Sequence, residues 1–283
     1  RLTGGEPLLS DRLLPLLEQV ALGRATPGDP LQGLRQVALT SNGVLLTQER
    51  ARALRSAGLE RITISLDAVE GAVVARMAGL RGGESAGNRL IQQVLGGLEA
   101  ARSAGFDPAV GALKLNAVIQ RGVNDDQLIP LARLARQQLL ELRLIEYMDV
   151  GNRNGWAMEQ VLPAAVMVDR ISRQWPLLSL GRSPGGTALR WRYRDGVAAI
   201  GVIASISEPF CGDCNRLRIT ADGQAFTCLF AGQGTDLKPA MNSDHDLERA
   251  ICTLNQRRQD HYSEEGRAAS GAAPRAEMAY LGG

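Results

Sequence analysis

Three of the four cysteines in this chain lie in one short stretch, spaced as C-x2-C-x13-C. They are Cys211, Cys214 and Cys228, and Arg216 and Arg218 follow the second cysteine at alternate positions. Thiolates are the usual ligands of zinc and of iron–sulfur clusters, and the forked, permanently charged guanidinium group suits phosphate. The stretch therefore predicts a metal or iron–sulfur centre that faces a phosphate-bearing ligand.

The residue types alone leave the kind of centre open. With Cys252 as a fourth thiolate, the cysteines match a tetrahedral zinc site, in which C-x2-C pairs are common. Cys252 also stands beside Ile251 and Leu254 in a helical pattern, which favours a buried core thiol. Arg216 and Arg218 share one face of a strand, so a solvated strand edge is the alternative for them.

The composition indicates a globular protein with an aliphatic core. Of 283 residues, 45% are hydrophobic, 22% are charged and only 4% are aromatic, which suits buried parallel strands covered by helices. The net charge is +2 without a basic stripe, so we expect no nucleic-acid partner. No apolar run of about 18 residues occurs, so we expect no membrane-spanning helix. Four cysteines without an export signal predict reduced thiols in a cytoplasmic protein.

Strand and helix signals alternate along the first half of the chain and predict a parallel α/β sheet. The predicted strands are residues 1–3, 37–40, 61–67, 112–119 and 142–147, and the predicted helices are 10–20, 47–57, 88–104 and 125–139. Residues 23–33 and 79–87 are predicted to be glycine-rich loops. Repeated βα units with right-handed crossovers curl into a full or partial barrel.

The rhythm changes after Met148. A polar, glycine-rich loop is predicted at residues 149–156, a helix at 164–175, a hairpin turn at 194–196 and a helix at 244–259. We therefore expect a partial barrel in residues 1–150 and a smaller α+β region in residues 151–283.

Polar residues follow each predicted strand of the first half. The clusters are Thr3-Gly4-Gly5-Glu6, Thr40-Ser41-Asn42-Gly43, Ser65-Leu66-Asp67, Asn116 with Lys114, and Glu146 to Asp149. Any one of them is also ordinary turn chemistry. Because ligands bind at the carboxyl ends of the strands in a βα barrel, the five together predict one shared pocket.

Several motifs, in this order, resemble one known family. Thr3-Gly4-Gly5-Glu6-Pro7 resembles the second signature of radical S-adenosylmethionine enzymes, and the whole chain is similar to the GTP 3′,8-cyclase family of molybdenum cofactor biosynthesis. The resemblance rests on RLTGGEPLL, LTSNG, ITISLDA, LNAVIQRGVNDDQ, EYMDVGNRNGW, PFCGDCNRLRIT and the terminal Gly282-Gly283. It implies an incomplete TIM-like barrel followed by a C-terminal region that carries an iron–sulfur cluster. The implied activity is that of a lyase that converts GTP to (8S)-3′,8-cyclo-7,8-dihydroguanosine 5′-triphosphate by a 5′-deoxyadenosyl radical mechanism.

The same resemblance implies site residues. Cys211, Cys214 and Cys228 would hold a [4Fe–4S] cluster whose open iron takes the purine of GTP. The residues implied near S-adenosylmethionine are Gly4, Gly5, Glu6, Ser65 and Met148. The residues implied to contact GTP are Arg1, Thr40, Lys114, Arg216 and Arg218. Independently of the resemblance, Asn116 and Arg143 lie at predicted strand positions that we expect to face the same pocket. No acid–base residue is assigned, and His245 and His261 are predicted to be surface residues.

The family also carries a second [4Fe–4S] cluster on a C-x3-C-x2-C motif, and no cysteine precedes Cys211 here. We therefore expect an N-terminally incomplete chain that lacks the first βα unit and is inactive as written. The Gly282-Gly283 tail is expected to enter the active site. The implied partners are GTP, S-adenosylmethionine, an electron donor and the downstream cyclic pyranopterin synthase, with a homodimer left open. The alternatives are another radical S-adenosylmethionine enzyme with an auxiliary cluster, or a zinc-stabilised interaction module.

Overall fold

A seven-stranded sheet forms the centre of the molecule. The fold is seen in a computed structural model that describes residues 1–256, 258 and 275–282. The strands run in the order β1-β2-β3-β4-β7-β6-β5. Their bounds are Ala38–Ser41 (β1), Arg61–Ser65 (β2), Leu113–Ile119 (β3), Glu141–Glu146 (β4), Leu177–Arg182 (β5), Leu189–Tyr193 (β6) and Ala199–Ile203 (β7).

Strands β1 to β4 and β7 are parallel, and β6 and β5 continue the sheet in antiparallel pairs. The predicted α/β class with a mostly parallel sheet is therefore confirmed. The hairpin between β6 and β7 turns at Gly196, whose φ is +75°, as the 194–196 signal predicts. Residues 177–203 thus extend the large sheet beyond the expected boundary at residue 150.

The first residues enter this sheet beside β1. Leu2 pairs in parallel with Leu39, and its amide donates to the Ala38 carbonyl at 2.7 Å while its carbonyl accepts from the Thr40 amide at 3.0 Å. Residues 1–3 therefore lie where the predicted strand end was expected, although only Leu2 makes a bridge.

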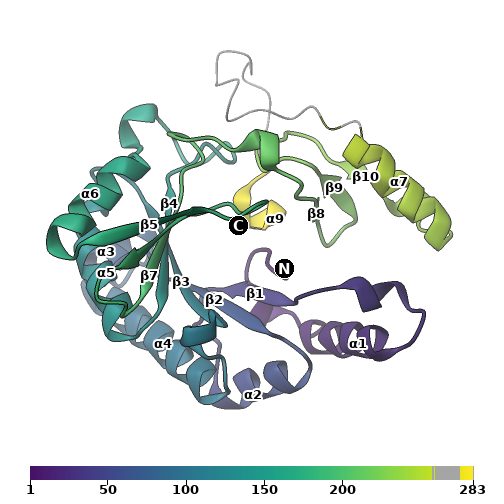
Figure 1. The fold of residues 1–283 in the computed structure, drawn as a ribbon, viewed down its shortest axis with the longest axis horizontal. Coiled ribbons are helices and arrows are strands. Elements are labelled where there is room, and N and C mark those ends of the chain that lie inside the picture. The colour runs from purple at the N-terminus through teal and green to yellow at the C-terminus, as the bar shows by residue number, and fades with distance from the viewer. Residues whose placement is uncertain (257, 259–274, 283) are drawn as a thin grey trace.

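Helices α1 to α6 lie along the outer side of the curved sheet (Figure 1). Their bounds are Leu13–Ala25 (α1), Gln48–Ser56 (α2), Gly71–Met77 (α3), Gly83–Ser103 (α4), Leu128–Gln137 (α5) and Ala164–Gln174 (α6). They cover the aliphatic face of the strands, where Leu39, Ile64 and Leu115 are 0% exposed. Because side chains alternate along a strand, the other face is left for polar residues on the inner, concave side.

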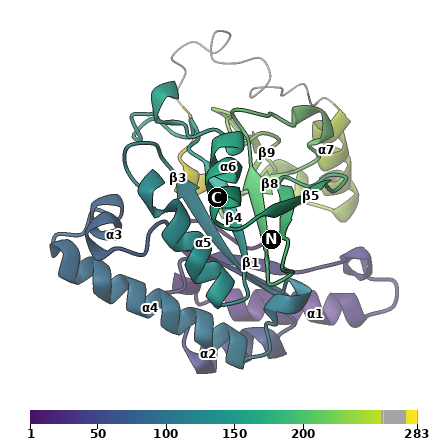
Figure 2. The same ribbon diagram turned by 60° about the vertical axis from the view of Figure 1, so that its left-hand side comes forward.

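A smaller sheet and two further helices complete the described part of the chain. Strands β8 (Arg218–Ile219), β9 (Gln224–Phe226) and β10 (Thr235–Asp236) form an antiparallel sheet. The helices are α7 (Asp244–Gln256) and the short α9 (Met278–Leu281). Figures 1 and 2 show the small sheet across the open side of the curve, α7 at its outer edge, and α9 near the middle, where both chain ends lie near each other.

Two of the predicted elements differ in the structure. The predicted loop at residues 79–87 is wrong, because α4 already begins at Gly83, and helix α3 was not predicted. The glycines mark a close helix contact instead of a turn: a Cβ added to Gly87 would overlap the Gly71 carbonyl. Within the described residues, none of the helices has the length and apolar composition needed to cross a bilayer.

The Gly71–Gly87 contact predicts a selective effect on stability. Gly87→Ala should lower the free energy of unfolding by about 1–3 kcal/mol, because the obstacle is backbone and cannot rotate away. Gly96→Ala is the control in the same helix: it is exposed with nothing within 4 Å, so it should raise stability by about 0.5–1 kcal/mol. Urea unfolding of both variants measures this, and equal effects would contradict the contact.

Candidate functional site

The concave face of the sheet holds a buried carboxylate surrounded by cations. The Glu141 side chain, on β4, is 8% exposed. It accepts from Lys114 Nζ of β3 at 2.9 Å, from Arg143 Nε of β4 at 3.0 Å and from Arg190 Nη2 of β6 at 3.1 Å. One carboxylate therefore connects three strands and fixes the direction of three cationic side chains.

A glycine of the neighbouring strand leaves room for this group. Gly201 on β7 pairs with both Arg143 and Arg190. A Cβ built there would lie 3.2 Å from the Ala188 Cβ, 3.7 Å from the Arg143 Cγ and 3.8 Å from Glu141 Oε1. The absence of a side chain at this position thus makes space on the inner face.

The charges in this group shift one another's pKa values. Burial, then repulsion from Arg143, lowers the pKa of Lys114 to about 8 in spite of its ion pair with Glu141. Burial alone would raise the pKa of Glu141, but Lys114 and Arg143 outweigh it and lower that pKa to about 2. At neutral pH the carboxylate is therefore ionised and the lysine is mostly charged.

Further arginines converge on the same place from distant parts of the chain. Burial, then repulsion from Arg61, Arg143, Arg218 and Arg216, lowers the pKa of Arg1 to about 10. The pKa of Arg218 is lowered by burial and by Arg216. Residues from the first strand end, β2, β4 and β8 thus form one cationic site, which suits a polyanion such as a phosphate chain.

Three buried polar atoms nearby lack a hydrogen-bond partner among the described residues. They are Oγ1 of Thr40, which is 8% exposed at the end of β1, Oδ1 of Asn116 on β3 and Nε of Arg190 on β6. Buried polar atoms are nearly always satisfied, so orphaned ones at a site indicate a ligand. Thr40 and Lys114 lie on β1 and β3 of the large sheet, whereas Arg218 lies on β8 of the small sheet, and Arg1 and Arg216 precede β1 and β8.

The residues predicted near S-adenosylmethionine lie at the carboxyl ends of three strands. Gly4 has φ +135°, and nothing would meet a Cβ within 4 Å at Gly4 or Gly5. Ser65 ends β2, and Met148 follows β4. Glu6 is already engaged: its carboxylate accepts from Ser41 Oγ and from the Asn42 amide, both at 2.8 Å. It thereby ties the first strand end to the end of β1.

The cysteine segment lies beside the arginines but is not gathered around one point. Cys211, Cys214 and Cys228 are each partly exposed. Arg216 donates to the Cys214 sulfur from Nε at 3.0 Å and from Nη2 at 2.8 Å, and the Phe230 amide donates to the Cys228 sulfur at 3.4 Å. Within the described residues, no three His, Cys, Asp or Glu side chains are arranged to hold a metal ion.

The donor set nevertheless has the chemistry of thiolate ligands. Burial raises the pKa of the Cys214 thiol, but hydrogen bonds from Arg216 and Arg258 outweigh it and lower that pKa overall. The guanidinium groups of Arg182 and Arg216 make cation–π contacts with the Phe210 ring, at 4.5 and 5.0 Å from its centroid. Three sulfurs beside cationic donors fit an iron–sulfur cluster, whose cysteine ligands are anionic.

Cys252 does not behave as predicted. It is exposed on α7, so the expected burial in the core is wrong. The reason is that α7 has no buried residue, so its apolar side chains are only partly covered. His245 is 80% exposed, as expected for a surface residue. His261 and Gly283 lie outside the described residues.

One residue that was expected at the pocket is used elsewhere, and two site residues were not predicted. Glu146 was expected at the pocket, but it is 0% exposed and accepts from the amides of Ala164 and Ile206 at 2.8 Å and of Ser207 at 2.9 Å. It therefore ties β4 to α6 and to the segment that leads to Cys211. Arg61 and Glu141 were missed as well, although alternation places Arg61 on the same strand face as Ser65.

Comparison with known proteins agrees with this geometry. Residues 1–135 match the family model of the radical SAM superfamily, and residues 140–264 match Molybdenum Cofactor Synthesis C. These matches identify a protein of the radical S-adenosylmethionine class, and the curved, mostly parallel sheet with its glycine-rich first strand end agrees with that class.

Individual relatives narrow this class. The chain is 70% identical over 283 residues to the GTP 3′,8-cyclase of Synechococcus sp. (strain CC9605), covering 100% of this chain and 82% of that protein. It is 45% identical over 288 residues to the GTP 3′,8-cyclase of Xanthomonas campestris pv. campestris (strain B100), covering 100% and 78%. It is 47% identical over 272 residues to that of Acidothermus cellulolyticus, covering 93% and 70%. The chain belongs to the GTP 3′,8-cyclase family.

Glu141→Gln tests how the carboxylate controls the cationic site. Without the ion pair, the pKa of Lys114 should fall below about 8. A phosphate chain prefers the charged amine, so binding of inorganic tripolyphosphate should weaken as rising pH deprotonates Lys114. The pH at which binding weakens should be lower in the variant than in the wild type. At acidic pH the variant should bind roughly 3- to 10-fold more tightly, because a repelling carboxylate is gone. Calorimetric titrations from roughly pH 6 to roughly pH 9 measure both effects.

Asp195→Asn serves as the control, since Asp195 pairs with Arg136 at 2.6 Å in an exposed turn. It should leave the pH profile unchanged. The same profile for Glu141→Gln and wild type would show that Glu141 does not control Lys114.

Proposed function

We propose that the protein to which this chain belongs binds GTP on the concave face and converts it to (8S)-3′,8-cyclo-7,8-dihydroguanosine 5′-triphosphate in molybdenum cofactor biosynthesis. The observation that carries the proposal is the convergence of Arg1, Arg143, Arg216 and Arg218 on one site. Four guanidinium groups repel one another unless an anion lies among them, and a triphosphate supplies that charge. The names of the relatives support GTP as the substrate.

In this proposal the chain's own residues bind and orient the nucleotide. Arg216 and Arg218 hold the triphosphate together with Arg1 and Lys114. The Thr40 hydroxyl donates to or accepts from a remaining polar group of the substrate, and Asn116 Oδ1 accepts from another. Glu141 keeps Lys114 and Arg143 in place before the substrate arrives. Such fixed donors lower the entropy lost when the reacting atoms are brought together.

The cofactors follow from the family and from the thiols described above. Cys211, Cys214 and Cys228 would hold a [4Fe–4S] cluster with an open iron for the purine, and Gly4, Gly5, Glu6, Ser65 and Met148 would border S-adenosylmethionine. When bound, these cofactors would supply the radical chemistry that converts GTP, while the residues named here would hold the cofactors in place. A second [4Fe–4S] cluster, an electron donor and a cyclic pyranopterin synthase that takes the product belong to the same proposal.

Replacing Arg216 or Arg218 with Ala should weaken GTP binding. A hydrogen bond between charged groups contributes about 1.5–3 kcal/mol, so each variant should raise the Kd by roughly 10- to 100-fold while the iron content stays intact. Titration of the reconstituted protein with GTP measures this. Arg192→Ala, an exposed arginine of β6, is the matched control. Wild-type affinity in both site variants would contradict their assigned role.

The cysteines give an independent test through metal content. After anaerobic reconstitution, the wild-type chain should contain iron and acid-labile sulfide, and Cys228→Ala should lose most of both. Cys252→Ala should keep them, because that thiol lies exposed on α7. One equivalent of zinc without sulfide, or equal losses in both variants, would exclude the cluster and favour a zinc-stabilised module.

A further inference from the structure

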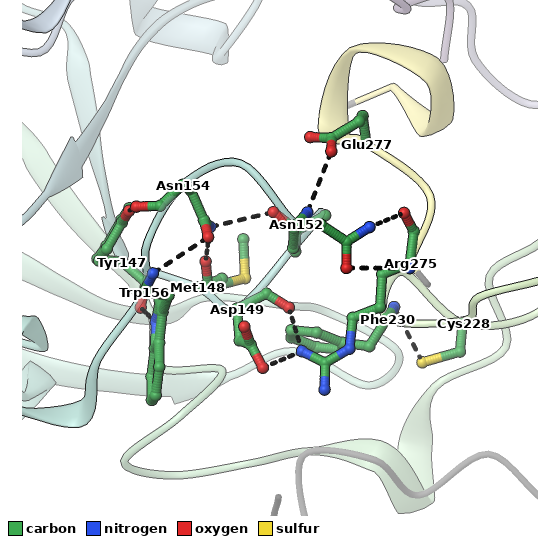
Figure 3. A network of polar contacts seen from close by, with 11 residues as sticks. Tyr147, Met148, Asp149, Asn152, Asn154, Trp156, Cys228, Phe230, Arg275 and Glu277 are labelled. Carbon is green, nitrogen blue, oxygen red and sulfur yellow. Dashed lines mark hydrogen bonds and ion pairs between the residues drawn. The ribbon is translucent and has the colours of Figure 1, made fainter. Parts of the chain in front are cut away.

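The loop after β4 does more than carry Met148. It is the EYMDVGNRNGW motif, and it is cross-linked internally: Asn154 Nδ2 donates to the Met148 and Val150 carbonyls at 3.1 and 3.0 Å, and Trp156 Nε1 donates to the Tyr147 carbonyl at 2.8 Å. Figure 3 shows that Asp149 and Asn152 of this loop point toward the segment that ends in α9. The proposed substrate contacts do not explain these residues.

A buried ion pair joins the loop to this C-terminal segment. The Arg275 guanidinium pairs with the Asp149 carboxylate, and their side chains are only 15% and 10% exposed. Arg275 Nη1 also donates to the Asp149 carbonyl at 3.3 Å. Because both groups are largely removed from water, solvent screens their attraction less than at the surface.

Asn152 adds three hydrogen bonds between the loop and the C-terminal segment. Its Nδ2 donates to the Arg275 carbonyl at 2.9 Å, and its Oδ1 accepts from the Arg275 amide at 3.3 Å. Its own amide donates to Glu277 Oε1 at 3.1 Å. At Gly151, φ is +78°, a conformation that favours glycine, and an added Cβ would displace the Glu277 carboxylate from its present position.

Beyond Glu277 the segment reaches both the small sheet and the first strand end. Leu281 is 5% exposed in a small core with Val150, Phe226 and Phe230. The Tyr280 hydroxyl donates to Asp222 at 2.9–3.0 Å. Gly282 then lies so close to residues 3 and 4 that a Cβ would be 2.5 Å from Thr3 Cγ2 and 3.2 Å from the Gly4 amide nitrogen.

We propose that Asp149 and Asn152 are positioning residues for the reaction, which hold residues 275–282 so that Gly282 is placed against Thr3 and Gly4. The proposal rests on the proposed function, because that strand end borders S-adenosylmethionine there. Arg275 and Glu277 are the matching groups on the tail. Asp149, Asn152, Arg275 and Glu277 act as one latch. The latch sets the position of the tail, and it makes no contact with GTP.

Hydrogen exchange and kinetics together test the latch. In Asp149→Asn, Asn152→Ala and Arg275→Ala, amides of residues 278–282 should exchange about tenfold faster or more, while amides of β3 and β4 keep their wild-type rates. In the reconstituted enzyme, kcat should fall about tenfold and KM for GTP should stay within about twofold. Arg173→Ala is the matched control, since its ion pair with Asp169 at 2.7 Å is 75% and 54% exposed; it should change neither quantity.

Two results would overturn the latch. One is unchanged exchange of residues 278–282 in all three variants, and the other is acceleration of β3 and β4 as well, which would mean that the contacts hold up the whole fold. Exchange needs no turnover, so it decides the latch whether or not the chain makes product. Wild-type affinity for GTP in both Arg216→Ala and Arg218→Ala would contradict the proposed function alone.

Discussion

The concave face of the large sheet carries more positive charge than its own carboxylates neutralise. Glu141 is the buried acid of this face, and it already bonds to Lys114, Arg143 and Arg190. The arginines that converge from the first strand end and from β8 find no comparable anion there among the described residues. Packing like charges together costs stability, and the cost is offset only when a highly charged anion binds. The rest of the structure can be understood as the framework that keeps these cations together.

The framework relies on a strict separation of the two faces of each strand. Aliphatic side chains face the helices and form one continuous core, so the charged residues on the other face do not have to contribute to it. Close backbone contacts make this possible where side chains would interfere: Gly201 opens the inner face, and Gly87 brings α4 onto α3. Glu146 closes the other end of β4 by binding three backbone amides and so fixes where the cysteine segment begins.

Much of this arrangement could be predicted from the sequence, and the failures have physical causes. Strands β1 to β4, their parallel direction and the hairpin at 194–196 follow from local patterns, which β-branched and turn residues carry within a few positions. Strands β5, β8, β9 and β10 were not predicted. Helix α3 and the start of α4 were missed because Gly83 and Gly87 read locally as turn residues. In the structure Gly83 begins α4, and Gly87 is required by the close contact with Gly71 of α3. The burial of Cys252 was wrong because helical periodicity shows which residues share a face but not whether anything covers it. Glu141 was missed because its partners come from three strands that only the folded sheet brings together.

The cross-linked loop after β4 has a thermodynamic consequence. Met148, at its start, borders the proposed S-adenosylmethionine site, and Asp149 and Asn152, the next residues along it, bind the C-terminal segment. The hydrogen bonds from Asn154 and Trp156 make these residues parts of one small rigid body. The tail and the cofactor both bind to this rigid body, so their binding is linked. If docking of the tail raises the affinity for the cofactor by some factor, binding of the cofactor raises the docking constant of the tail by the same factor. A chain terminus can in this way act as an intramolecular effector, present at a fixed effective concentration that no dilution of the protein changes.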